Sequence, residues 1–309
     1  MKKAATALGL LILFFLLLLF PDSVKIGAEQ GLSLWYHSVV PILFPFVLLS
    51  NLMVSTESLG FFLQPFFFLS EKWPGLNPWI FYPLFFGLFC GFPMGAKAIS
   101  DLLEQGHLTR KEASFLLPLV NQASPMFLAG YVGVHILKKE LSFLEIIFFL
   151  YFPVFLIFSI YFLFKSKKGI SGRAVSFSTK KKNSMSPSSE HTIWNSFTVI
   201  VTIGIYMMIF SIAVELCHRL LPERPLGSLL LCSLEFSSGL DQIRQFTFLT
   251  HKEQTGFILA LTSFGGFCTA MQTHDMIHHT GLSTKSYLIR KFLLAAVVFL
   301  LYSWMSSSS

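Results

Sequence analysis

Two segments of the chain carry the same phrase, LTRKEASFLLPLVNQAS at 108–124 and LTHKEQTGFILALTSFGG at 249–266. Leu, Thr, Lys and Glu match in place, although the two copies lie about 140 residues apart. After a one-residue shift the following apolar residues also align: Phe115, Leu117 and Leu119 with Phe257, Leu259 and Leu261. A duplicated polar-to-apolar segment is typical of membrane proteins built from repeats, whose binding site lies where the repeats meet.

The composition is that of a membrane protein. Hydrophobic residues make up 53% of the 309 residues and charged residues only 13%, whereas a soluble domain carries roughly 25% charged residues. A spanning helix needs about 20 apolar residues. Runs that reach this length with at most one formal charge lie at 32–54, 142–164 and 192–214. In the shorter run 287–305, we expect Arg290 and Lys291 to extend toward the lipid head groups.

A basic segment divides the chain. Residues 165–191 are rich in Lys, Arg and Ser, and the positive-inside bias favours a cytoplasmic loop there over a nucleic-acid-binding patch. We therefore predict a first membrane repeat at 32–164 and a second at 192–305. Residues 1–21 hold two lysines and then an apolar run without a small-residue cleavage motif, which favours a retained transmembrane anchor helix outside the repeats over a cleaved secretory signal.

The two halves follow the same order. Each begins with a long apolar helix that carries a tryptophan, continues through a Gly-containing interruption to the LTxKE phrase, and closes with a hydrophobic helix. Thr and Glu are three apart in both phrases, as in a capping box, so each phrase should begin a helix. The basic charges lie at the end of 142–164 but at the start of the last helix. The corresponding helices then run in opposite directions, which predicts inverted repeats.

Four interruptions fall inside the apolar halves: GFPMGAK at 91–97, VNQASP at 120–125, LEFSSG at 234–239 and TSFGGFCT at 262–269. Pro removes a backbone donor and Gly weakens a helix. Broken helices occur at membrane depth only where they are buried in protein or line a wet cavity. We therefore expect 113–137 and 254–270 to be discontinuous or re-entrant. The predicted fold is an all-α polytopic membrane protein of two inverted repeats plus an extra N-terminal helix.

At these residues the chain resembles a known family. GFPMGAKAISDLLEQGHLTRKEASFLLPLVNQASPMFLAGYVGV, at 91–134, resembles the core of the YlbJ-type sporulation integral membrane proteins, within the group that carries the nucleoside-recognition, or Gate, domain. TSFGGFCTAMQTHDMIHHTGLSTKSYLIRKFL, at 262–293, is similar to that family's S-F-G-G…Q segment and closing helix. The resemblance implies a multi-pass protein of the bacterial cytoplasmic membrane. For its best-known branch it implies movement of dipicolinic acid during spore development.

The candidate substrate-binding residues are the polar and small residues of the interruptions. Lys97, beside the Gly-Pro break, is a candidate anion site, with a lysine at the membrane interface as the alternative. Glu235 is a candidate for coupling the entry of a proton or sodium ion, again against an interfacial placement. For the other polar residues the alternative is helix-to-helix hydrogen bonding. The remaining candidates are Gly91, Pro93, Gly95, Asn121, Gln122, Ser124, Ser237, Ser238, Gly265, Gly266 and Gln272.

Metal and disulfide chemistry are less favoured. The four cysteines lack CxxC spacing and are interpreted as small buried apolar residues. His274 and His278 have the i, i+4 spacing of zinc ligands, but no HExxH glutamate and no third ligand are evident. A polar turn is the preferred interpretation of this segment.

These observations favour a secondary transporter of a small polar solute, anionic or heteroaromatic, similar to dipicolinic acid or a nucleoside. The chain has no GxxxxGK[ST] motif, so we expect no ATP hydrolysis, and we predict neither an enzyme nor a cofactor. The expected partners are the lipid bilayer, the solute and a coupling cation, but no nucleic acid. The sequence leaves the oligomeric state open. The alternative function is a non-transporting membrane factor for spore-envelope assembly.

Overall fold

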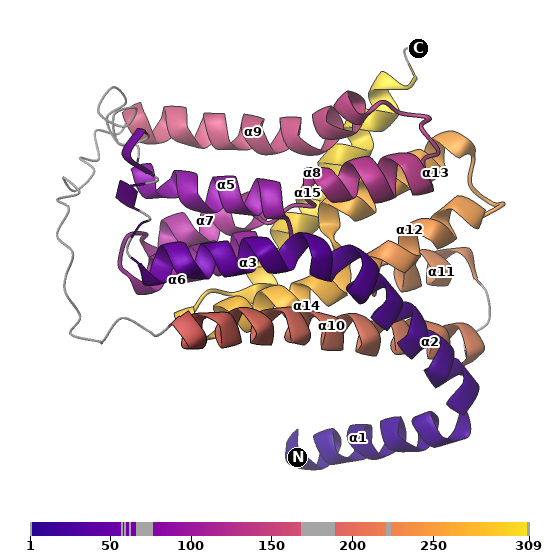
Figure 1. The fold of residues 1–309 in the computed structure, drawn as a ribbon. Helices are drawn as coiled ribbons and strands as arrows, with labels where there is room; N and C mark the ends of the chain where they lie inside the picture. Colours follow the sequence, from indigo (N-terminus) through magenta and orange to yellow (C-terminus); the bar gives the residue numbers. More distant parts are fainter. Residues whose placement is uncertain are drawn as a thin grey trace.

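The chain is an all-α polytopic membrane protein (Figure 1). The computed structural model describes residues 2–56, 58, 60–61, 63–65, 77–167, 189–220 and 224–307. Every regular element in these ranges is a helix. Four of the described helices are long and apolar enough to cross a membrane, or five if the bent pair at the N-terminus counts as one span. Residues 168–188, most of the expected basic loop 165–191, lie outside the described ranges.

Two helices precede the repeats, and each repeat then follows the same plan. The first two helices are α1 (Lys2–Leu19) and α2 (Pro21–Leu34), followed by the π-helical turn η1 (Trp35–Val39). The first half comprises α3 (Val40–Ser55), η2 (Pro78–Ile80), α5 (Phe81–Cys90), α6 (Met94–Glu104), α7 (Arg110–Val120), α8 (Pro125–Phe127), the π-helix η3 (Leu128–Ile136) and α9 (Phe143–Lys167). The second half comprises α10 (Ser189–Leu220), α11 (Pro225–Cys232), α12 (Phe236–Gln245), α13 (His251–Phe264), α14 (Gly266–Ile277), η4 (His278–Thr280) and α15 (Thr284–Met305).

The two halves are inverted with respect to each other. In each, a broken hairpin (α5–α6 or α11–α12) leads through the LTxKE turn into a broken helix (α7–α8–η3 or α13–α14) and then a long closing helix. Figure 1 shows the α6–α7 turn and the α12–α13 turn at opposite ends of the bundle. It also shows α9 ending at one end and α15 at the other. The inverted order expected from the flanking charges is therefore confirmed, and 113–137 and 254–270 are both discontinuous.

A capping box begins the helix that follows each LTxKE turn. The backbone N–H of Glu112 donates to Thr109 Oγ1 at 3.3 Å, and the Thr109 N–H donates to Glu112 Oε2 at 3.0 Å. Thr250 and Glu253 repeat the pair, at 3.3 and 2.8 Å. Each box satisfies donors that the first turn of a helix leaves free. The duplicated phrase is thus a duplicated helix start, as its Thr-to-Glu spacing predicts.

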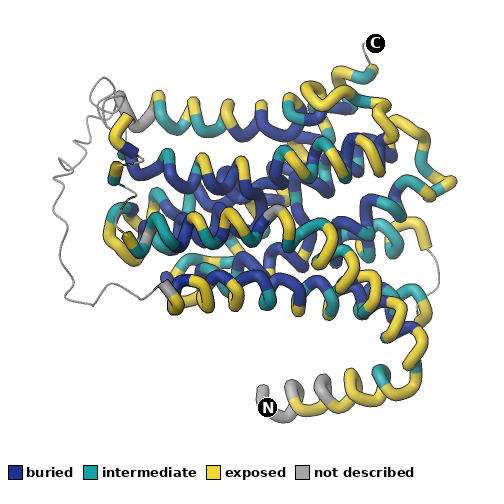
Figure 2. The backbone as a smooth tube through the Cα atoms, in the orientation of Figure 1, coloured by how far each residue is buried: buried dark blue, intermediate teal, exposed yellow. Residues whose placement is uncertain are grey.

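The N-terminal helices are joined to the repeats through two glycines. The axes of residues 11–19 and 21–39 differ by 97°, and α1 lies apart from the bundle with an exposed surface (Figures 1 and 2). A Cβ at Gly27 would lie 2.7 Å from Ile212 Cα, and one at Gly31 would lie 2.7 Å from Met208 Cα. This GxxxG spacing lets the backbones of α2 and α10 approach closely. The anchor role of residues 1–21 stays a prediction.

Enlarging Gly31 is therefore expected to separate α2 from α10. Gly31→Leu places a side chain against the backbone of Met208, and overpacking of this kind costs about 1–3 kcal/mol. The thermal unfolding midpoint (Tm) of the protein purified in detergent should fall. Gln30→Leu is the matched control because residue 30 is exposed on the same helix. Equal unfolding midpoints for the two variants would contradict the close contact.

Removing either cap should destabilise the protein by a similar amount. Thr109→Ala and Thr250→Ala each delete the acceptor for a helix N-terminus, a change that typically costs about 1 kcal/mol. We expect both variants to unfold at a lower temperature than the wild type. Thr247→Ala, at an exposed position outside the helices, serves as the control. A loss confined to one of the two caps would show that the turns are not equivalent.

Candidate functional site

The breaks of both repeats meet around one partly enclosed cavity. The cavity has a volume of about 80 Å³. Its walls are formed by residues of the first half (α3, α5, the 121–124 break and α8), of the second half (α10, α12 and α14) and of η1. Five residues proposed from the sequence line it: Gly91, Ser124, Glu235, Ser237 and Gln272. The structure therefore brings together candidates that are up to 181 residues apart in the chain (91 to 272).

Gly91 and Gly265 allow the first-repeat hairpin tip to approach the breaks of both repeats. Gly91 has φ +84°, and a Cβ there would lie 2.8 Å from the backbone nitrogen of Ser124. Gly265 has φ +82°, and a Cβ there would lie 2.7 Å from the Phe92 ring, which belongs to the other repeat. A larger residue at either position would be strained by its backbone conformation and would also clash. The Gly265–Phe92 contact therefore sets the spacing between the halves at the cavity, whereas the Gly91–Ser124 contact sets the spacing within the first repeat.

The break in the second repeat is closed by backbone hydrogen bonds. The N–H groups of Phe267 and Cys268 donate to the carbonyls of Ser233 and Leu234, at 2.7 and 2.9 Å. A helix start leaves such N–H groups without intrahelical partners. The two carbonyls come from the break between α11 and α12. The α11–α12 break therefore supplies the acceptors that the first N–H groups of α14 lack. This arrangement lets irregular backbone exist at membrane depth.

Glu235 lies at the start of α12 with 1% of its surface exposed. Its carboxylate accepts hydrogen bonds from the backbone N–H groups of Ser237 and Ser238, at 3.2 and 2.7 Å. The carbonyl of Ser237 accepts a hydrogen bond from Tyr131 OH at 2.9 Å, across the repeat boundary. Glu235 is therefore both a helix cap and a buried acidic group in the cavity wall.

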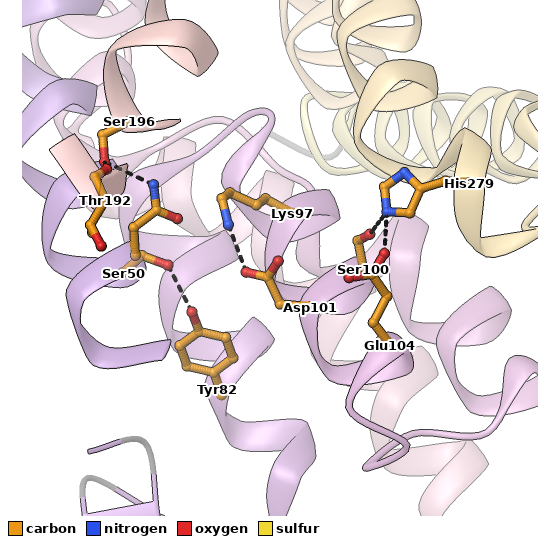
Figure 3. Close-up of polar contacts among 10 residues, drawn as sticks. Ser50, Tyr82, Lys97, Ser100, Asp101, Glu104, Thr192, Ser196 and His279 are labelled. Carbon is orange, nitrogen blue, oxygen red and sulfur yellow. Dashed lines mark hydrogen bonds and ion pairs between the residues drawn. The ribbon is translucent and has the colours of Figure 1, made fainter. Parts of the chain in front are cut away.

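Lys97 takes part in a separate polar contact. Its Nζ donates to Asp101 Oδ2 at 2.7 Å, and the two side chains are only 10% and 19% exposed (Figure 3). Pro93 precedes α6 and its carbonyl accepts the Lys97 N–H at 3.1 Å. Gly95 packs against the α7 break, where a Cβ would lie 2.6 Å from Val120 O. Neither Lys97 nor Asp101 lines the cavity, so an external anion at Lys97 would compete with Asp101.

A buried polar cluster lies at the first-repeat break. Asn121 Nδ2 donates to Thr273 Oγ1 and to Tyr287 OH, both at 2.9 Å. Lys291 Nζ donates to the Asn121 carbonyl at 2.9 Å and to Gln122 Oε1 at 3.1 Å. All five residues are buried, and the bonds join α7 to α14 and α15. We call Asn121, Gln122, Thr273, Tyr287 and Lys291 the central polar cluster.

The placement of Lys291 corrects an expectation. The sequence suggested that Arg290 and Lys291 both extend to the head groups, yet Lys291 is 0% exposed. Arg290 alone is exposed, and it donates to the Ser114 carbonyl at 2.6 Å. Lys291 is roughly 10 Å along the axis from the first residue of α15, too deep for an inward-facing lysine to reach water. A charge two turns into an apolar helix is the signal that could have identified it.

Equivalent side-chain contacts close the two ends of the molecule. At one end His279 Nε2 lies 2.6 Å from Glu104 Oε1 and 3.1 Å from Ser100 Oγ, joining η4 to α6 (Figure 3). At the other end His135 Nε2 lies 3.5 Å from Asp241 Oδ1, joining η3 to α12. Because α6 and α12 correspond under the inverted repeat, the same kind of contact joins the halves at each end.

The remaining candidates lie close to the same breaks. Gly266 has φ +76°, and a Cβ there would lie 2.9 Å from Ser233 O. Ser238 is half-buried, and its hydroxyl donates to the Glu235 carbonyl at 3.2 Å. Gln272 Nε2 lies 3.4 Å from Cys268 Sγ, and α14 contributes both Gln272 and Thr269 as polar residues to the cavity wall. The sequence identified the breaks, whereas Thr273, Tyr287 and Lys291 were missed.

Comparison with known proteins gives one partial relative. The chain is 32% identical over 117 residues to the sporulation integral membrane protein YlbJ of Bacillus subtilis (strain 168). The match covers 37% of this chain and 28% of that protein, so the chain matches under a third of the relative's length. No family model matches the chain, and no solved structure matches it. The chain is therefore similar to part of a sporulation integral membrane protein.

Proposed function

We propose that the protein is a secondary carrier for a small polar solute. The observation that carries the proposal is the cavity in which discontinuous segments of two inverted repeats converge. In carriers built this way, the substrate binds between the repeats near the middle of the membrane and is exposed to each side in turn. Its similarity to a sporulation protein supports a role in spore formation.

The lining supports a solute that is both polar and planar. Ser124, Glu235 and Gln272 offer hydrogen-bonding groups, while Phe92, Phe127 and Phe236 contribute aromatic surface to the same cavity. Aromatic side chains stack on flat rings, and a few placed polar groups fix orientation. Dipicolinate and nucleosides both combine a ring with polar substituents. Glu235 is the candidate group for coupling a proton or sodium ion to solute movement.

The proposal requires the cavity to open toward each side of the membrane in turn. The cavity has a volume of about 80 Å³, and Cys90, Glu235 and Cys268 in its wall are almost fully buried. We infer that a solute reaches these groups only when the helices around the cavity move apart.

Removal of a polar group from the cavity should impair uptake. Gln272→Leu keeps a similar side-chain size but deletes the hydrogen-bonding amide, and the loss of one such contact lowers affinity by about tenfold. Uptake of labelled dipicolinate and of labelled nucleosides is measured in liposomes that contain the purified protein. Gln245→Leu, at an exposed position on α12, is the control. Failure of the folded wild type to move either class would favour the non-transporting membrane factor.

Two natural thiols offer a direct test of opening. Cys90 and Cys268 line the cavity and are 2% and 1% exposed. In a Cys217→Ser, Cys232→Ser background, a water-soluble maleimide should label them slowly, because a carrier opens the cavity only part of the time. A transported solute should change the labelling rate. SDS-denatured protein gives full labelling as the control, and thiols that never react in the native membrane would contradict alternating access.

A further inference from the structure

The amino group of Lys291 has two oxygen partners and an aromatic one, but no acidic one. Two of its donors reach the Asn121 carbonyl at 2.9 Å and Gln122 Oε1 at 3.1 Å, and the Phe92 ring centroid lies 4.9 Å away. An ammonium has three N–H donors, and an aromatic face attracts a cation. Among the residues that the structure describes, the ion pairs do not include Lys291.

The oxygen atoms around Lys291 are of the kind that bind a small cation. A helix break frees backbone carbonyls, and unwound carbonyls coordinate alkali metal ions in carriers. Here the freed carbonyl of Asn121 and the amide oxygen of Gln122 point to one spot. Asn121 Oδ1 is also buried and has no hydrogen-bond partner. These oxygen atoms favour a positive charge, and the Lys291 side chain on α15 places its amino group among them.

We propose that Lys291 is a tethered cation, which takes the place of a metal ion at the first-repeat break and positions one wall of the cavity. The ammonium holds the 121–124 segment through two oxygens and holds the hairpin tip through Phe92. Phe92 in turn lines the cavity and contacts Gly265 of the other repeat. The inference rests on the proposed function only in treating this cavity as the solute site.

Removal of the charge should therefore loosen the break even where the side-chain volume is kept. The test compares Lys291→Arg, which keeps charge and donors, with Lys291→Met, which is unbranched, apolar and of similar length. Lys285→Ala removes an exposed lysine from the same helix and is the control. Thermal unfolding of the full chain in detergent is the first measurement. We expect the Met variant to show the larger downward shift of Tm and the Arg variant the smaller one.

A small ammonium ion added from solution distinguishes charge from packing. In Lys291→Ala the oxygens lose their cation, and ethylammonium chloride should restore part of the lost Tm. Tetramethylammonium chloride at the same concentration carries the charge but has no N–H donor, so it should not. Wild type and Lys285→Ala should respond equally to the two salts. None of these readouts uses transport, so their failure is distinct from failure of the proposed function.

The cavity itself provides the second measurement. In a background where Cys217, Cys232 and Cys268 are replaced by serine, Lys291→Met should raise the maleimide labelling rate of Cys90, which adjoins Phe92 in the cavity wall. Lys291→Arg should stay near the wild-type rate. A Met variant as stable as the wild type would overturn the proposal, as would an alanine variant that ethylammonium fails to stabilise. If neither the Arg variant nor the Met variant accumulates in the membrane, the site requires the shape of lysine and not its charge. That outcome would also overturn the proposal.

Discussion

The structure depends on how the backbone groups freed at the helix breaks are satisfied, because lipid offers them no partners. In the second repeat the two breaks satisfy each other in part through the backbone, since the N–H groups of α14 donate to carbonyls of the α11–α12 break. Local side chains do the rest: Thr269 donates to the Gly265 carbonyl, and Glu235 accepts from the first N–H groups of α12. In the first repeat the donors are side chains from the closing helices. Tyr151 OH on α9 donates to the Ala123 carbonyl at 2.8 Å, and Lys291 on α15 donates to the Asn121 carbonyl. The breaks can face one another only because the long helices bring these donors to them.

The two repeats therefore share a plan but differ in chemistry. The first-repeat break is held by the buried side chain of Lys291, whereas the second-repeat hairpin tip carries a buried acidic side chain, Glu235. Each side chain depends on backbone groups of a broken segment: Lys291 on a freed carbonyl, and Glu235 on the first N–H groups of α12. Both residues belong to the second half, on α15 and at the start of α12, so the polar chemistry of the two breaks is not related by the inversion. Glu235 lines the cavity, whereas Lys291 reaches the cavity wall only through Phe92.

Much of the fold could be predicted because its signals are local or periodic. The Thr-to-Glu spacing marked both helix starts, Gly and Pro marked the breaks, and flanking charges gave the inversion. The site was only partly predictable. Five of the cavity residues could be predicted because they lie in or beside helix-breaking segments that the sequence shows directly: Gly91, Ser124, Glu235, Ser237 and Gln272. Thr273 and Tyr287 lie in helices, and the sequence does not show that tertiary packing brings them into contact with Asn121. Lys291 was misassigned because the sequence does not show which face of α15 is inward, and exposed Arg290 beside it suggested the lipid interface.

If the protein works as the proposed carrier, the contacts indicate which surface would separate when the cavity opens. One wall is joined across the repeats by the hydrogen bonds of Asn121 with Thr273 and Tyr287, so α7, α14 and α15 move together. The opposite wall comes from η1, α3 and α10, whose contributions include the apolar Leu43, Ile203 and Met207. Separating apolar side chains inside a membrane costs less than elsewhere, because lipid tails can replace the lost contacts. Breaking buried hydrogen bonds leaves groups that lipid cannot satisfy. In the proposed carrier, opening along the α3–α10 wall would keep the central polar cluster intact. It would instead break the hydrogen bonds of Ser50 with Tyr82, which join α3 to α5, and of Tyr206 with Asp275, which join α10 to α14.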